Sequence, residues 1–590
     1  MKKRYLYLAL LLIPIFASLS LGQNDFIYYL QKGQKSSRPD DRIIYLTKAL
    51  ELWRETDGLQ TRVSAYNMRG NSYSDKGLYR KAIGDYSEAI KLNPRYVMAY
   101  NNRAIAYREI GKTSQAIADY DKAVEIDAGF DTAYYNRGIA HHVSGAYKKA
   151  VTDYTRTVEL NPQNYLAFNN RGVAYHYLGN YRKAIEDYDR ALKINPGYER
   201  AFLNRGIAHR RRKEYNRAIG DFNRAIKINP RNQSAYILRG NTLREKKDYN
   251  RAIKDYSTAI EINPDNEVAY IERGSTQREK GDYNKAITDF DTAVKINPKN
   301  ETTFIHRGKT YREIGMFDKA IVDFDEAIRV HPGCSLAFYY RGDAYKDKGE
   351  YGRALKDYNR AIQCDPTDAN AFFNRANVLS EKGEYARAIK DYTRTLKINP
   401  NLAEAYNNRG ILYARMGQYK KAIRDYTRAI KLKPTLALAF NNRGVCHMML
   451  KQYNSSLKDL DRAIELRKGY TNAYFNRGNT HKELRGFRLA LRDYTQAISL
   501  DPGFANAYNN RGIVYYRLGQ FDKALEDYNR ALQADPSLAE AFNNRGVLYA
   551  AERQYAKALE DYNQALKINP QLKEARRNRE IATGHRRKGR

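Results

Sequence analysis

The most regular charged side chains in this 590-residue sequence are fifteen arginines and fifteen aspartates, each recurring every 34 residues. We number the 34 positions of the repeat from Tyr165, which places Arg69 to Arg545 at position 7 and Asp85 to Asp561 at position 23. A guanidinium and a carboxylate can form two parallel hydrogen bonds. We therefore expect a ladder of Arg–Asp pairs, within a repeat or across the junction to the next. The alternative is that these arginines bind a ligand.

Asparagine stands at position 6 in ten of the repeats and forms an asparagine row. An amide both donates and accepts hydrogen bonds, so such a row can hold the backbone of an extended peptide whatever its sequence. The competing interpretation is that each amide bridges neighbouring helices. Leu238, Glu272, His306 and Tyr340 interrupt the row, which predicts an early and a late docking segment. The row consists of Asn102, Asn136, Asn170, Asn204, Asn374, Asn408, Asn442, Asn476, Asn510 and Asn544.

Position 12 is basic, or can become basic, in eight successive repeats. Acidic residues such as Glu109 and Asp347 follow directly in several copies, so one interpretation is a mixed, solvated face. The sharper hypothesis is that this position-12 row attracts an acidic ligand, more strongly when its histidines are protonated in mildly acidic surroundings. The row consists of Arg108, His142, His176, Arg210, Arg244, Arg278, Arg312 and Lys346.

The sequence lacks the residue patterns that catalysis or a bound cofactor would require. It has no nucleophile and base pair, no phosphate-binding loop and no metal-ligand spacing, so we predict no enzyme, no cofactor and no metal. His142 and His176 could share a metal, but two isolated imidazoles are typical of surface residues. Cys334, Cys364 and Cys446 lie in separate repeats without CxxC spacing, and we expect them to pack as small apolar residues.

The elements that carry these rows are predicted by the repeat itself. Its unit reads YLAFNNRGVAYHYLGNYRKAIEDYDRALKINPGY and recurs fifteen times over residues 63–572 without insertion or deletion. Proline at position 32 marks the same helix stop in thirteen copies. Small residues at positions 8, 20 and 27, with an aromatic residue at position 24, predict two closely packed antiparallel helices. Glycine at position 15 suits a left-handed turn between them.

This pattern of small residues, aromatic residue and proline resembles the tetratricopeptide repeat. The resemblance implies an all-α, right-handed superhelical solenoid of about 15 tandem antiparallel helical hairpins, with first helices lining a concave groove and second helices facing outward. Position 12 is among those the family exposes to the groove, and the asparagine row resembles that of the repeat domain of O-GlcNAc transferase. The sequence departs from the family at position 7, where the usual residue is apolar. The lysines of the family's dicarboxylate clamp are also missing.

The two ends of the sequence differ from the repeat. Residues 1–22 combine a basic start, an apolar run over residues 5–21 and small residues before Gln23, which is typical of a secretory signal peptide cleaved after Gly22. An uncleaved membrane anchor formed by residues 5–21 is the alternative. Residues 23–62, with Trp53, should form an irregular helical cap, and residues 573–590 a capping helix with a basic tail. We therefore expect export to the periplasm, outer envelope or extracellular space.

The formal net charge of +36 indicates which partners the chain could attract and says nothing about its fold. Strongly basic surfaces attract nucleic acid, anionic lipid or acidic polymers. Basic residues are scattered among acidic ones and export removes the usual target, which argues against nucleic acid. We predict a non-catalytic scaffold that binds a protein or an extended, acidic peptide, in contact with a membrane only through an uncleaved N-terminal segment. The alternative is attachment to an anionic cell-envelope polymer or membrane surface, which salt would weaken more steeply.

Overall fold

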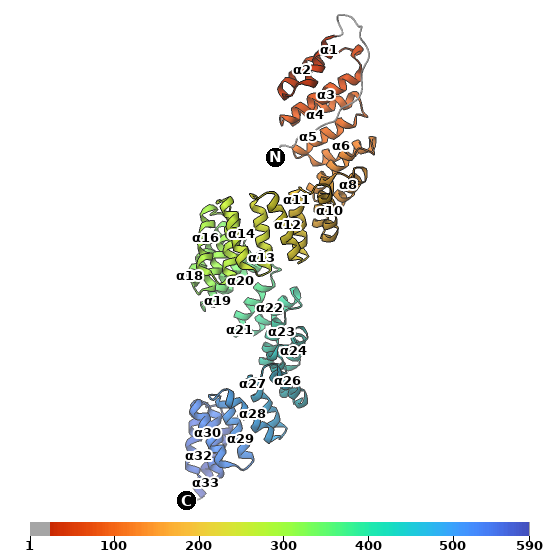
Figure 1. Cartoon of the computed structure of the whole chain (residues 1–590). Helices are drawn as coiled ribbons and strands as arrows, with labels where there is room; N and C mark the ends of the chain where they lie inside the picture. Colours follow the sequence, from red (N-terminus) through yellow and green to blue (C-terminus); the bar gives the residue numbers. More distant parts are fainter. Residues whose placement is uncertain (1–23, 589–590) are drawn as a thin grey trace. The chain divides into compact units, whose positions relative to one another are not determined.

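The computed structural model describes residues 24–588, and the structural statements below concern these residues (Figure 1). The predicted signal peptide or anchor in residues 1–22 lies outside them. The described residues form 33 α-helices and one short 3₁₀ helix, without a strand. None of these helices is long and apolar enough to cross a bilayer. The chain divides into two compact units between Asn297 and Pro298, and each unit is described by itself.

Fifteen helical hairpins follow one another along the two units, each made of a first and a second helix. In the N-terminal unit the first helices are α3 (Leu59–Asp75), α5 (Val97–Glu109), α7 (Asp131–Val143), α9 (Tyr165–Tyr177), α11 (Glu199–Arg211), α13 (Gln233–Glu245) and α15 (Glu267–Lys280). Their second helices are α4 (Tyr79–Leu92), α6 (Thr113–Ile126), α8 (Tyr147–Leu160), α10 (Tyr181–Ile194), α12 (Tyr215–Ile228), α14 (Tyr249–Ile262) and α16 (Tyr283–Ile296).

The C-terminal unit repeats the arrangement. Its first helices are α17 (Glu301–Glu313), α19 (Ser335–Asp347), α21 (Ala369–Glu381), α23 (Ala403–Arg415), α25 (Ala437–Met449), α27 (Thr471–Glu483), α29 (Ala505–Arg517) and α31 (Ala539–Ala551). Its second helices are α18 (Phe317–Val330), α20 (Tyr351–Cys364), α22 (Tyr385–Ile398), α24 (Tyr419–Leu432), α26 (Tyr453–Leu466), α28 (Phe487–Leu500), α30 (Phe521–Ala534) and α32 (Tyr555–Ile568). The predicted all-α solenoid of tandem hairpins is confirmed.

Close contact between the helices of a hairpin explains the small residues. A Cβ atom added to Gly172 would lie 2.6 Å from Cε1 of Tyr188, the aromatic residue at position 24. Ala184 and Ala191, at positions 20 and 27, are fully buried. Any larger side chain at these places would separate the helices, because protein interiors have no spare volume.

The turn inside each hairpin uses the left-handed backbone conformation expected from glycine at position 15. Gly179 has a φ of 74°, which costs glycine little because it has no Cβ atom. Lysine or arginine occupies the same conformation in a few copies, for example Lys213 with a φ of 62°. The packing of the hairpin thus imposes this backbone conformation, and glycine at position 15 only lowers its energetic cost.

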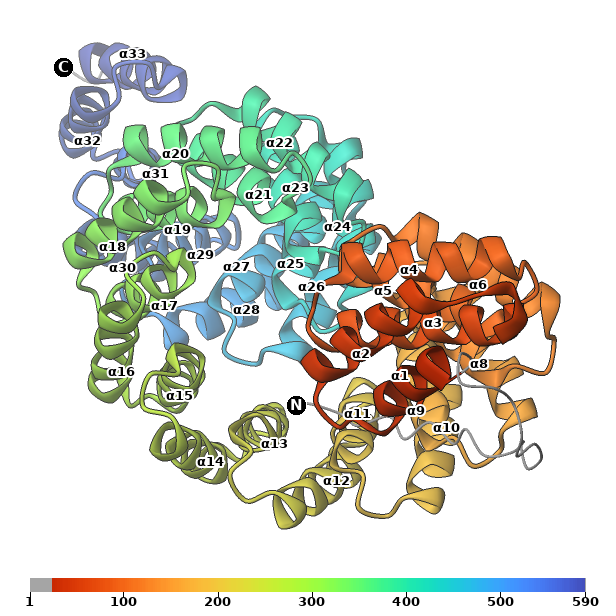
Figure 2. The same ribbon diagram turned by 90° about the horizontal axis from the view of Figure 1, so that it is seen from above.

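Stacking of the hairpins places the two kinds of helix in different layers of each unit. Every second helix packs against the first helix of the next repeat within its unit, and successive first helices, such as α9 and α11 or α25 and α27, also contact each other. In Figure 2, α11, α13 and α15 lie on the inner side of the N-terminal unit, with α12, α14 and α16 outside them. The first helices therefore form the layer on which a groove of this fold would lie.

The ends of the described chain continue the stacking. α1 (Asn24–Lys35) and α2 (Pro39–Leu52) pack on α3 through Phe26, Leu46 and Ala65, and the 3₁₀ helix η1 (Glu55–Asp57) connects α2 to α3. At the other end α33 (Lys573–Lys588) packs Ala582 against Tyr562. We expected a basic tail after residue 583 or so, but α33 continues to Lys588.

Candidate functional site

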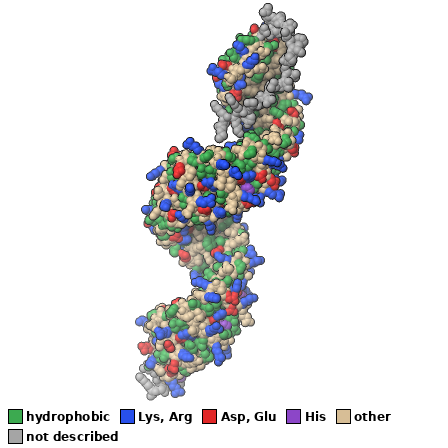
Figure 3. Space-filling view, viewed as in Figure 1, with side chains coloured by type: hydrophobic (Ala, Val, Ile, Leu, Met, Phe, Trp, Pro, Cys, Tyr) green, Lys and Arg blue, Asp and Glu red, His purple; other side chains and the backbone are tan. Residues whose placement is uncertain are grey.

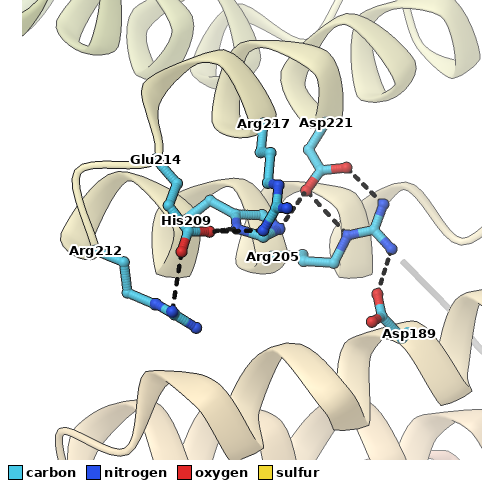
Figure 4. Close-up of polar contacts among 7 residues, drawn as sticks. All are labelled: Asp189, Arg205, His209, Arg212, Glu214, Arg217 and Asp221. Atoms are coloured by element: carbon cyan, nitrogen blue, oxygen red, sulfur yellow. Dashed lines mark hydrogen bonds and ion pairs between the residues drawn. The ribbon is translucent and has the colours of Figure 1, made fainter.

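The position-7 arginines lie between the two helices of their hairpins and form the predicted ladder. In the repeat shown in Figure 4, Arg205 donates from Nε to Oδ2 of Asp221 at 2.9 Å and from Nη2 to Oδ1 at 2.5 Å. All fifteen repeats contain this two-bond pair. The aspartate side chains are only 3% to 9% exposed. The ladder is therefore partly buried, which favours its structural interpretation.

A third hydrogen bond of the same arginines joins successive repeats. Nη1 of Arg205 on α11 donates to Oδ1 of Asp189 on α10 at 2.5 Å (Figure 4). Bonds of this kind recur along each unit. The acceptor stands at position 25, which is Ser, Thr, Asn or Asp in all fifteen repeats. The ladder thus acts both within a repeat and across the junction. Sequence analysis missed the acceptor, although its regular occurrence was a visible signal.

An aromatic ring at position 4 completes the surroundings of each arginine. The guanidinium carbon of Arg205 lies 5.4 Å from the ring centre of Phe202. The corresponding distance is 5.3 to 5.7 Å in all fifteen repeats. Such cation–π contacts are attractive. The family's usual apolar residue is therefore replaced by a cation whose charge and hydrogen bonds are satisfied locally.

Histidine at position 11 extends one of these pairs toward the turn. Nδ1 of His209 lies 2.7 Å from Oε2 of Glu214, and its Nε2 lies 3.9 Å from Oδ2 of Asp221 (Figure 4). Arg212 and Arg217 form ion pairs with the same Glu214 at 3.0 and 3.4 Å. The hydrogen bond to His209 and these charges lower the pKa of the Glu214 carboxyl. The charged groups of this cluster are thus paired with one another.

The asparagine row bridges neighbouring first helices, as one of its two interpretations predicted. Nδ2 of Asn136 donates to Oδ1 of Asn101 at 3.0 Å, an acceptor at position 5 of the preceding repeat. Nδ2 of Asn408 instead donates to Oδ1 of Asn377, at position 9, which also accepts from the hydroxyl of Tyr392. Nine of the ten row amides donate to the preceding first helix. Contact of the same amides with a peptide stays a prediction.

The arginines of the position-12 row are largely paired with carboxylates. In the N-terminal unit, Arg210 lies 3.8 Å from Glu245, and Arg244 lies 2.5 Å from Glu272. Each of these carboxylates belongs to the first helix of the next repeat. The row therefore contributes less net charge to the first-helix layer than its sequence suggests.

In the C-terminal unit the same pairing is found at the end of the row. Arg312 lies 3.0 Å from Asp343 and 2.6 Å from Asp347, and Lys346 lies 3.8 Å from Asp347. These contacts favour the interpretation of a mixed face. An acidic ligand would have to compete with the protein's own carboxylates for these cations.

The two histidines of the row belong instead to an aromatic cluster on α7, α8, α9 and α10. The rings of Tyr147 and Tyr177 stack in parallel, with centres 4.7 Å apart. His142 meets both rings edge-on at 5.2 and 5.5 Å, and His176 meets Tyr181 at 5.1 Å. We call these five residues the aromatic cluster. Tyr177 is 60% exposed, so the cluster presents a ring face to solvent.

A small cavity of about 170 Å³ opens beside the aromatic cluster. Ile139 and Val173 form its apolar walls, and Tyr154, Asn170 and His142 supply polar groups. Nδ1 of His142 is buried and has no hydrogen-bond partner among the described residues. Burial lowers the pKa of His142 and also that of His176, the next residue of the position-12 row. These lowered pKa values oppose the hypothesis that mild acid protonates the two histidines. Nδ1 of His142 remains a polar atom without a hydrogen bond to the described chain, in a residue that lines the cavity.

The cysteines and possible metal ligands add no further site. Cys334 and Cys446 are buried, but Cys364 is exposed, so the expectation of packing is wrong for Cys364. Cys364 is the last residue of α20, where its side chain faces solvent rather than a neighbouring repeat. Burial raises the pKa of the Cys446 thiol to about 12. Within residues 24–588 no group of three or more His, Cys, Asp or Glu side chains is placed to hold a metal ion.

Comparison with protein families gives matches along most of the repeat region. Profiles described as Tetratricopeptide repeat match residues 63–96, 86–118, 132–164, 165–198, 199–232, 234–266, 403–436, 505–538 and 539–572. Profiles described as TPR repeat match residues 106–145, 274–315, 342–383, 376–417 and 488–519. Together these segments cover more than half of the chain. Comparison with curated proteins gave no match.

Similar solved structures include three with helical repeats. A tetratricopeptide repeat protein from Parabacteroides merdae ATCC 43184 is 19% identical with a TM-score of 0.37, over 42% of this chain and 98% of that chain. The APC/C hetero-tetramer Cut9-Hcn1 is 16% identical with a TM-score of 0.38, over 83% and 97%. YrrB, a TPR protein with an unusual peptide-binding site, is 24% identical with a TM-score of 0.27, over 32% and 97%.

Proposed function

Because the chain belongs to the tetratricopeptide repeat family, whose repeats are protein-binding and generally non-catalytic scaffolds, we propose that it binds an extended segment of a partner protein. The segment lies on the first-helix layer of the N-terminal unit. The observation that carries the proposal is the aromatic cluster, with its exposed Tyr177, beside the 170 Å³ cavity.

The aromatic cluster has the properties of an energetic centre of an interface. Aromatic side chains bury a large area on binding and lose little conformational entropy, so they dominate many interfaces. The stacked rings of Tyr147 and Tyr177 hold each other in place before any partner arrives. These side chains therefore lose little conformational entropy when a partner covers them, which favours affinity.

The adjoining cavity supports recognition of one apolar side chain. Its walls, Ile139 and Val173, suit an aliphatic group of the partner. Nδ1 of His142 can accept a hydrogen bond from a backbone N–H, which would satisfy a buried polar atom that lacks a partner. Asn170 lies at the same cavity and has one amide hydrogen beyond the one it donates to Tyr135.

Charges next to the aromatic cluster favour an acidic segment. A second, open cavity of about 450 Å³ includes Tyr181 and is bordered by Arg182 and Arg212. Arg182 lies 3.8 Å from Glu186 and Arg212 lies 3.0 Å from Glu214, so carboxylates that flank the apolar side chain of the partner would compete with these two glutamates for the guanidinium groups. We therefore propose a partner segment with an apolar residue followed or preceded by acidic residues.

Binding of an array of immobilised peptides tests this proposal. The full chain should bind peptides that combine one central apolar residue with acidic neighbours better than the same peptides with neutral neighbours. Tyr177→Ala should lower their affinity by about tenfold or more, as expected for a central aromatic contact. Tyr516→Ala is the control, since Tyr516 is a half-buried tyrosine near the end of a first helix of the C-terminal unit, at position 12, and its ring centre lies 5.5 Å from that of Phe521. Equal losses in both variants, or no bound peptide, would contradict the proposal.

We also propose that the scaffold acts outside the cytoplasm, in the periplasm, the outer envelope or the extracellular space. The support comes from residues 1–22, whose basic start, apolar run and small residues are typical of a secretory signal. Mass spectrometry of the chain recovered from the producing cell measures the mature N-terminus. A chain that begins at Gln23 supports cleavage, and one that retains Met1 and fractionates with membranes supports the anchor instead.

A further inference from the structure

Four consecutive second helices of the C-terminal unit carry a basic residue at both position 22 and position 26. These helices are α20, α22, α24 and α26. Lys and Arg side chains are visible at the surface of this part of the molecule in Figure 3. We call the eight residues the basic stripe. It consists of Lys356, Arg360, Lys390, Arg394, Arg424, Arg428, Lys458 and Arg462.

The basic stripe faces away from the hairpin interior. Residues four apart lie on the same side of a helix, one turn from each other. On α24 the residues between and after the two cations, Asp425, Tyr426 and Ala429, are buried against the first helices. Seven of the eight stripe residues are exposed and Arg428 is half-buried. Their charged groups therefore point to solvent on successive helices.

Most cations of the basic stripe have no carboxylate partner in the described chain, although Asp459, Asp461 and Glu465 lie beside Lys458 and Arg462 at the α26 end. Within the described residues the stripe has one ion pair, between Arg462 and Glu465 at 2.8 Å. Arg360 donates to the amide oxygen of Gln363 at 3.0 Å, which leaves its charge unbalanced. Lys397 and Lys431 add two exposed cations at position 29 of α22 and α24. Positive potential accumulates over such a face because each charge reinforces its neighbours.

This concentration is local and does not follow from the net charge of the chain. At positions 22 and 26 of α8, α10, α12 and α14 the N-terminal unit has four basic residues, one acidic residue and three uncharged ones. At position 22 of α30 and α32 the C-terminal unit itself has glutamate. These eight comparison residues in the N-terminal unit are Thr152, Arg156, Glu186, Arg190, Gly220, Arg224, Lys254 and Thr258.

The chemistry of the face decides what kind of partner it fits. None of the exposed large apolar residues of the described chain lies on α20, α22, α24 or α26. Protein interfaces and membrane-inserting faces use apolar anchors, and proteins that hold single-stranded nucleic acid stack its bases on aromatic rings. The basic stripe offers charge alone, and five of its eight residues are arginine, whose planar fork matches phosphate.

We propose that the outer face of α20, α22, α24 and α26 binds a linear polyanion that carries phosphate groups along its length. Successive helices each present two cations to successive phosphates, so one chain of the polymer crosses several repeats. This binding is independent of the peptide site on the first-helix layer of the N-terminal unit. A scaffold with both sites would link a protein partner to an anionic polymer.

Binding of inorganic polyphosphate to the full chain tests the inference. The stripe variant replaces Lys356→Gln, Lys390→Gln, Arg424→Gln and Lys458→Gln, none of which removes an ion pair. The control replaces Arg156→Gln, Arg190→Gln, Arg224→Gln and Lys254→Gln, which changes the net charge equally on second helices of the N-terminal unit, at position 26 in three of them and at position 22 in the fourth. Only Arg156 among them has an ion pair within the described residues, with Glu159 at 3.2 Å. The stripe variant should lose about tenfold or more in affinity, with a shallower salt dependence, and the control about threefold or less.

Three results would overturn the inference. Equal losses in the two variants would show that net charge alone attracts polyphosphate. Binding to vesicles with anionic lipid, without binding to polyphosphate, would assign the face to a membrane. A single-stranded DNA oligomer bound more tightly than polyphosphate of equal charge would assign it to nucleic acid. Circular dichroism and thermal unfolding of both variants show that they are folded, so a loss of binding is not a loss of structure.

Discussion

The aromatic cluster of the N-terminal unit and the basic stripe of the C-terminal unit use opposite chemistry. The cluster combines the ends of the first helices α7 and α9 with the starts of the second helices α8 and α10, whereas the stripe lies on second helices alone. The cluster is built from rings in mutual contact, with imidazoles whose protonation burial opposes. The stripe is built from solvated cations that make almost no contact with each other or with carboxylates. The cluster suits a short-range contact with a defined shape, and the stripe suits long-range attraction that salt screens.

The same interior supports both surfaces. The Arg–Asp pair of α9 and α10, Arg171 with Asp187, has the same two hydrogen bonds as Arg409 with Asp425 on α23 and α24. Residues that hold the hairpins together thus recur, while residues at positions 12, 13, 22 and 26 differ from repeat to repeat. Position 17, which supplies Tyr147 and Tyr181, is aromatic in fourteen of the fifteen repeats, so it is the residues at positions 12 and 13 that make the aromatic cluster local. A solenoid of this kind can change its binding surfaces without changing its core, since each repeat contacts only its neighbours.

The largest expected effect concerns this shared interior. Arg171→Leu and Arg409→Leu should each lower local stability by about 3 kcal/mol, because Asp187 or Asp425 would stay buried without its cation. Urea unfolding of the full chain measures the loss in each unit. Arg182→Leu is the control, since the Arg182 side chain is 77% exposed and should change little. An unchanged unfolding profile in either ladder variant would contradict the structural role of the ladder.

The next largest effect is a difference between the two surfaces in how strongly salt weakens binding. Between about 50 and 200 mM salt, polyphosphate binding should fall by about 100-fold, since each neutralised phosphate releases a counterion. Binding of a peptide to the aromatic cluster should fall less, by about tenfold at most, because only its few acidic residues interact through charge, while its ring contacts and hydrogen bonds are screened weakly. Titrations of both probes against the same protein preparation measure the two slopes. Parallel slopes would mean that both ligands are held by charge.

The contribution of the exposed ring gives a smaller effect. Tyr177→Phe should keep most of the peptide affinity, because the ring that stacks on Tyr147 remains. Tyr177→Ala should lose about tenfold, and its unfolding midpoint should stay close to that of the parent because the side chain is 60% exposed. Isothermal titration calorimetry measures the affinities. If both variants lose affinity equally, the hydroxyl and not the ring makes the contact.

The smallest effect is a dependence of stability on pH in the N-terminal unit. Burial lowers the pKa of His142 and His176 in the folded chain, whereas both histidines titrate at about 6.5 when unfolded. The unfolded chain then binds more protons, so stability is fully present above about pH 6.5 and is lost as the pH falls below it. Thermal unfolding from pH 7 to pH 5 measures this loss, and His142→Phe with His176→Phe should reduce it. Greater stability in acid would contradict the burial effect.

The hairpins could be predicted because they depend on neighbours in sequence. Gly172 and Tyr188 lie in one repeat, and their contact follows from the geometry of any two helices joined by a short turn. The pairing of Arg205 with Asp221 could be anticipated for the same reason. The acceptor Asp189 was not predicted, although a polar residue at position 25 recurs in every copy, because its bond to Arg205 crosses the junction between two repeats and depends on how they stack.

The repeat sequence by itself determined the all-α solenoid, the number of hairpins and the positions of the Arg–Asp ladder, because a 34-residue period repeats the same local contacts. Only the tertiary structure decided that Tyr147 stacks on Tyr177, that the asparagine row bridges helices and that His142 is desolvated. These features depend on the angle and spacing between successive hairpins. They also depend on burial, because the atoms that bury a side chain come from several repeats and the sequence of a single repeat does not reveal them.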